Sequence, residues 1–145
     1  MTDLPEILPN LEHNVALNAS TIEGCGGRAE AAALTWGGSE RDSDPRFGRG
    51  GRYKLIIVAD PLYDDNHPAL LAGAIDEHLS LDSGARVLIM VPQRDEITKE
   101  LLAILRDTLA SGPTPLVCSD ESIVPGQDDW GDDGVDDSTP SNDLP

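Results

Sequence analysis

The chain has 145 residues, enough for one domain with a sizeable core, and aromatic residues make up only 3% of it, so the core must be aliphatic. Its formal net charge is −17, from 27 acidic and 10 basic side chains, and residues 119–145 contain no Lys or Arg. This charge argues against nucleic acid or an anionic membrane as the main partner, because both would be repelled, and it favours a basic protein.

The cysteines and histidines indicate the cellular compartment and whether the chain binds a metal. Cys25 and Cys118 are far apart, and the chain opens without a signal peptide, so we expect reduced thiols in a cytoplasmic protein, with the nucleus as the alternative. The three histidines lack metal-ligand spacing, and no apolar run reaches the roughly 20 residues that a membrane span requires. We therefore expect neither a metal site nor a membrane segment.

The first part of the chain is predicted to form one helix and one short strand. Apolar residues recur with a period of about 3.6 across residues 7–17, and Pro9 should delay the regular helix to about residue 9. Residues 19–32 are small, polar and glycine-rich, which indicates a loop. The stretch AALTWGG predicts a short strand ending at Trp36, and the charged residues 39–52 predict a surface loop.

The second part alternates strands with helices. Strands are expected at 53–60 (YKLIIVAD) and 85–92 (ARVLIMVP), helices at 68–79 and 96–110, and a last short strand in PLVCSDE. Strands without polar alternation, interleaved with helices, predict an α/β fold with a parallel sheet covered on both faces. Residues 1–124 would form this domain, and the acidic residues 125–145 are expected to be disordered.

Candidate functional residues lie at the ends of the predicted strands, where α/β sheets bind their ligands. Asp60 ends a strand that looks buried, and it either meets a ligand or caps the next helix, as Asp64, Asp65 or Asn66 also would. Paired acids such as Asp64 and Asp65 are also potential ligands of a divalent metal. Trp36 is either a core residue or a stacking surface for a purine.

Four segments in this order resemble the class I methyltransferases of family 16: TDLPEILPNLEHNVALN, ALTWGG, YKLIIVADPLYDDNHPALL and ARVLIMVPQRDE. The resemblance covers nearly the whole of residues 2–131, and the combination of DLPEILPNL with AD-xx-Y makes it specific. It is strongest to the fungal lysine methyltransferases that modify translation elongation factors. It implies a Rossmann-like sheet, S-adenosyl-L-methionine as cofactor, and methyl transfer to a lysine of a protein substrate.

The resemblance also implies roles for five residues. Asp3, at the end of the family's second strand, would hydrogen-bond the ribose hydroxyls of the cofactor. Trp36 would flank the adenine, and Ala59 would be the small residue beside the cofactor. Asp60 and Tyr63 match the acid and the tyrosine of the D-xx-Y element that lines the channel for the target lysine, where they would orient the ammonium and assist its deprotonation.

One departure from the family changes what we expect of this chain. Family members carry a first strand and a glycine-rich turn upstream of TDLPE, whereas Met1 stands directly before that segment here. We therefore expect a truncated, incomplete sheet with a gap between ALTW and YKLIIVAD, and weak or absent cofactor binding and activity. The free edge of LIIVA would invite self-association.

Two other functions remain open at this level. The first is a non-catalytic acidic interaction module, or pseudoenzyme, that binds a basic partner or its own kin. The second is a metal site formed by Asp60, Asp64 and Asp65 for hydrolysis or phosphoryl transfer.

Overall fold

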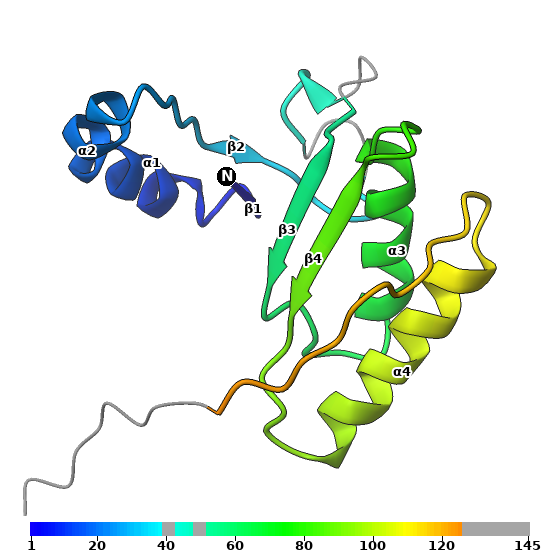
Figure 1. Ribbon diagram of the computed structural model, residues 1–145. Helices are drawn as coiled ribbons and strands as arrows, with labels where there is room; N and C mark the ends of the chain where they lie inside the picture. Colours follow the sequence, from blue (N-terminus) through cyan, green and yellow to red (C-terminus); the bar gives the residue numbers. More distant parts are fainter. Residues whose placement is uncertain (39–42, 48–51, 126–145) are drawn as a thin grey trace, which may run out of the picture.

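The computed structural model describes residues 1–38, 43–47 and 52–125, and in these ranges it forms two small sheets and four helices (Figure 1). The elements in chain order are β1 (Thr2–Asp3), α1 (Leu8–Leu17), α2 (Ala19–Gly24), β2 (Ala32–Ala33), β3 (Leu55–Ala59), α3 (His67–His78), β4 (Arg86–Met90) and α4 (Glu96–Ser111). The expected disorder of the acidic tail and much of the predicted 39–52 loop lie outside the described residues.

The strands pair in two separate parallel sheets. β1 pairs with β2, with Thr2 opposite Ala32, and β3 pairs with β4, with Leu55 opposite Arg86. Within the described ranges, no ladder of hydrogen bonds joins one sheet to the other. The α/β fold class is therefore confirmed, and the division of the sheet falls where the sequence placed a gap.

The core lies between the β3–β4 sheet and the two long helices. Pro68 stands in the first turn of α3, where its missing N–H costs no hydrogen bond, and Asp95 caps α4 by accepting from the Thr98 N–H at 2.8 Å. Val87 and Ile89 of β4 are partly buried and pack against the buried apolar residues, which come from β3, α3, α4 and the residues that follow β3 and α3: Val58, Leu62, Leu71, Ala72, Ile75, Leu79, Leu101 and Leu105. Their burial holds β3, α3, β4 and α4 together as one unit.

Only one face of the β3–β4 sheet is covered by the described residues. Side chains alternate between the faces of a strand, and α3 and α4 both lie on the same side of this sheet (Figure 1). Leu55, Ile57, Leu88 and Met90 point the other way, and each is more than half exposed. The prediction of a sheet covered on both faces therefore holds for one face in this part of the chain.

The amino-terminal elements form a unit with little core of its own. Residues 19–24 form helix α2, so the prediction of a loop from residue 19 was wrong there. Neither α1 nor α2 has a buried residue, and β2 contributes Ala32 at 6% exposure. β2 is also shorter than predicted, so Trp36 lies beyond the end of the strand.

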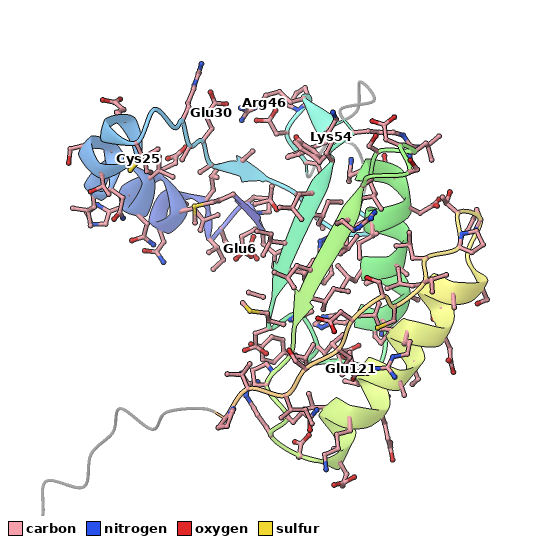
Figure 2. All side chains as sticks on the ribbon, in the orientation of Figure 1. Glu6, Cys25, Glu30, Arg46, Lys54 and Glu121 are labelled. Carbon is pink, nitrogen blue, oxygen red and sulfur yellow. The ribbon has the colours of Figure 1, made fainter. Side chains whose placement is uncertain are left out.

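An ion-pair network connects Glu30, two residues before β2, to the segment at 43–47. The Arg46 guanidinium contacts Glu30 at 2.5 Å and Asp44 at 2.8 Å, and Figure 2 shows Arg46 and Glu30 close together. The hydrogen bonds and charge of Arg46 lower the pKa of Asp44 to about 2. The Asp44 N–H also donates to the Ala33 carbonyl at 2.9 Å, so this segment follows the end of β2.

The segment after α4 runs along the helix as extended chain. The predicted strand in PLVCSDE is absent from the described residues, which give it no neighbouring strand to pair with. The Leu116 N–H donates to the Leu109 carbonyl at 3.0 Å, and Arg106 pairs with Glu121 at 2.7 Å. Contacts with α4, not sheet pairing, hold this segment in place.

Candidate functional site

Asp60 leaves the end of β3 in an unusual backbone conformation. Ala59 is the last residue of β3, opposite Met90, and the Asp60 N–H continues the ladder by donating to the Met90 carbonyl at 2.8 Å. The φ angle of Asp60 is 51°, in the left-handed region that residues other than Gly uncommonly adopt. Such strain occurs preferentially at functional sites, so the turn at Asp60 is a candidate position for chemistry.

The Asp60 carboxylate is the centre of a three-residue cluster. Its Oδ2 accepts hydrogen bonds from the Tyr63 hydroxyl and from Nη2 of Arg94. The guanidinium carbon of Arg94 also lies 5.4 Å from the centroid of the Tyr63 ring, within the range of a cation–π contact. The structure therefore brings Asp60 and Tyr63 together and adds a cation that sequence reasoning missed.

Asp60 does not cap the following helix. The residue at the start of α3 is Asn66, whose side chain makes no capping hydrogen bond, and the side chain that accepts from the Asn66 N–H belongs to Asp64. The two hydrogen bonds that Asp60 does accept come from side chains at the end of the sheet. Of the two interpretations of Asp60 that the sequence leaves open, helix capping is therefore excluded.

The contacts of Asp60 set its charge. The hydrogen bond from Tyr63 lowers the pKa of Asp60 most, the hydrogen bond and charge of Arg94 lower it further, and burial opposes both. Asp60 is therefore ionised at neutral pH. An ionised carboxylate beside a phenol is suited to receiving an ammonium group or another N–H donor.

His67, in the first turn of α3, connects this cluster to Trp36. Its Nδ1 accepts from the Tyr63 N–H at 3.1 Å. The His67 ring lies edge-on to both aromatic rings, with centroid distances of 6.1 Å to Trp36 and 6.4 Å to Tyr63. His67 shows no metal-ligand spacing in the sequence, and only the fold reveals that it bridges Trp36 and Tyr63.

The two remaining candidate residues lie in the amino-terminal part. Asp3 ends β1, and its carboxylate accepts from the Leu4 N–H at 2.7 Å. Trp36 is half-buried, packs against the core of the other sheet, and precedes Gly37, whose φ of 65° turns the chain. Within the described ranges, no hydrogen bond or ion pair joins Asp3 to Asp60.

Asp64, the first of the two acids that follow Tyr63, has a local structural role. Asp64 Oδ1 accepts from the backbone N–H and from the side-chain amide of Asn66, both at 2.9 Å. Nowhere in the described part of the chain do three His, Cys, Asp or Glu side chains gather as they would around a metal ion. The same part contains no helix with the length and apolar character to cross a membrane.

Comparison with known proteins identifies the family. The sequence profile described as lysine methyltransferase matches residues 1–108. The chain belongs to this family. The lysine methyltransferase relatives include protein-lysine N-methyltransferase EFM2 of Saccharomyces cerevisiae, which is 31% identical over 131 residues. That match covers 90% of this chain and 29% of the yeast protein, so the chain spans less than a third of its relative's length. No solved structure matches the chain.

Proposed function

We propose that this chain provides the lysine-binding side of an S-adenosyl-L-methionine-dependent protein-lysine methyltransferase. The observation that carries the proposal is the cluster at the end of β3, where Asp60 and Tyr63 of the D-xx-Y element share a hydrogen bond. Family membership supports the reaction class. The target would be a lysine in a basic protein, because the chain carries a net charge of −17.

The residues present fit the cofactor in their chemistry. The Asp3 carboxylate is exposed and suits the ribose hydroxyls, Trp36 offers a flat aromatic surface, and Ala59 keeps the end of β3 free of a large side chain. When bound, S-adenosyl-L-methionine supplies an electrophilic methyl group on a sulfonium. The remaining chemistry falls to the lysine side of the site.

Asp60 and Tyr63 would bind and orient the lysine nitrogen. A lysine attacks only as the neutral amine, so its ammonium must first lose a proton. The lowered pKa of Asp60 makes this carboxylate a weak base, so its main task would be to align the nitrogen and pass its proton on to solvent. Alignment of the reacting atoms supplies most of the acceleration in such a transfer.

We also propose that this chain alone binds the cofactor weakly. Asp3 belongs to the β1–β2 sheet and Ala59 to the β3–β4 sheet, so within residues 1–38, 43–47 and 52–125 no common sheet fixes the spacing of the adenosine-side residues. Isothermal titration of S-adenosyl-L-methionine into the monodisperse chain is expected to give a Kd weaker than about 100 μM. A low-micromolar Kd would show that these residues suffice.

A non-catalytic acidic module is the second candidate, favoured by the net charge and the uncovered apolar face of β3–β4. Asp60→Ala separates the two functions, because methyl transfer should be lost while binding of a basic partner should change little.

We further propose a cytoplasmic location, with elongation factors as the first substrates to test. The free cysteines Cys25 and Cys118 suit a reducing compartment.

A further inference from the structure

Arg94 belongs to the same site although it lies 34 residues after Asp60 in the chain. It stands in the connection between β4 and α4, where its N–H donates to the Pro92 carbonyl at 3.0 Å. The next residue, Asp95, caps α4 through the N–H of Thr98 at 2.8 Å and its hydroxyl at 2.7 Å. The start of a regular helix thus fixes the backbone from which Arg94 reaches Asp60.

The two oxygens of the Asp60 carboxylate have different surroundings. Oδ2 accepts from both Tyr63 and Arg94. Oδ1 is buried and has no hydrogen-bond partner among the described residues. An acceptor that is buried without a donor is unfavourable, so an N–H that reaches Oδ1 after the neighbouring side chains move would be stabilised there.

We propose that Arg94 is a positioning residue: by holding Oδ2 of Asp60 and the face of Tyr63, it leaves Oδ1 as the acceptor for the substrate lysine nitrogen. The inference rests on the proposed lysine-binding function of this site. A carboxylate rotates readily about its last bond and exchanges its two oxygens. Two donors on Oδ2, one of them also stacked on the Tyr63 ring, fix the carboxylate in one orientation.

Arg94 could instead compete with the substrate lysine for Asp60 and Tyr63, and this role makes a different prediction. Its guanidinium occupies a carboxylate and an aromatic face, two groups that also attract a lysine ammonium. If Arg94 were a competitor of the substrate, its removal would strengthen lysine binding. If it positions Asp60, its removal weakens lysine binding, and Arg94→Lys restores part of the loss because an ammonium still donates to Oδ2 but does not stack as a guanidinium does.

The first test follows the Asp60 carboxyl carbon by NMR during a pH titration of the full chain. Arg94→Ala should raise the pKa of Asp60 towards its ordinary value, because the hydrogen bond and the charge of Arg94 both lower this pKa. The matched control is Arg106→Ala, since the Arg106 side chain is 48% exposed against 49% for Arg94, and it pairs with Glu121 elsewhere. An Asp60 titration that is the same in both alanine variants would overturn the proposal.

The second test titrates the same variants with N-acetyl-lysine N-methylamide, using the norleucine analogue without the amine as the control probe. The Kd of the lysine probe, measured from the shifts of the Asp60 and Tyr63 NMR signals, should rise about fivefold or more in Arg94→Ala. In Arg94→Lys the Kd should return part of the way to that of the parent chain. Tighter or unchanged binding in Arg94→Ala would contradict positioning. If the parent chain binds neither probe, the lysine-binding function and the assignment of Oδ1 fail, while the pKa titration still decides whether Arg94 holds Asp60.

Discussion

Substitution of Ile57 by Thr tests whether the apolar face of the β3–β4 sheet is uncovered in solution. Ile57 is 61% exposed, and the change removes two apolar carbons while keeping a residue that favours strands. Each carbon contributes about 0.8 kcal/mol to the free energy of unfolding when it is fully buried. Because about two fifths of Ile57 is buried, the substitution should lower the free energy of unfolding by about 0.6 kcal/mol. If this face were covered, the loss of two fully buried carbons and the burial of the Thr hydroxyl would together lower the free energy of unfolding by about 3–5 kcal/mol.

The measurement is urea denaturation followed by circular dichroism at two protein concentrations. Val58→Thr is the control, because Val58 is the next residue in β3, points to the covered face and is 9% exposed. Its buried hydroxyl should cost about 1–3 kcal/mol. A loss at Ile57 larger than that at Val58 would refute the uncovered face, and a loss that grows with protein concentration would indicate that a second copy covers it.

Three further local features are tested by substitution: the turn at Gly37, the ion pair of Asp44 and the cap of α4. Gly37→Ala should lower the melting temperature, because Gly37 has φ 65° and an added Cβ would lie 2.5 Å from the Leu70 side chain. Gly73 lies inside α3 with open space around it, so Gly73→Ala should instead stabilise the chain by about 0.5–1 kcal/mol. Asp44 has a pKa of about 2 against an ordinary 3.8, so its contribution to stability is complete above about pH 4 and is lost as the pH falls towards 2. Melting temperatures across this range should depend less on pH in Asp44→Asn, and an unchanged slope would contradict the ion pair. Asp95→Ala should lower the helical signal and melting temperature by removing the cap of α4, whereas Asp95→Asn should change both less, since an amide oxygen still accepts; equal losses in the two variants would argue against the cap.

The elements around the core could be predicted from the sequence because burial dictates their pattern. The near-continuous apolar runs of β3 and β4 and the helical spacing in α3 and α4 gave bounds within about two residues of the structure. Helix α2 was missed because its residues are small and polar and it buries nothing. The extended segment at 115–121 was mistaken for a strand because apolar content does not say whether a neighbouring strand is present.

The candidate site could be predicted only in part. Asp60 and Tyr63 are three residues apart in the sequence, so a local turn suffices to bring them together. Arg94 and His67 carry no periodic or motif signal, and their proximity to Asp60 and Tyr63 depends on how β4 and α3 pack. The uneven surroundings of the two Asp60 oxygens likewise exist only in the folded chain.

The most direct test of the proposed function exchanges the 131 matched residues of yeast EFM2 for the corresponding part of this chain and measures methyl transfer to protein lysines from labelled S-adenosyl-L-methionine. The exchanged protein should transfer methyl groups, and Asp60→Ala should reduce the rate by about a hundredfold or more. Asp65→Ala, in the same loop, is the matched control and should leave the rate nearly unchanged. Equal rates for the Asp60 and Asp65 variants, with the exchanged protein active, would contradict the assignment of the lysine site to the end of β3.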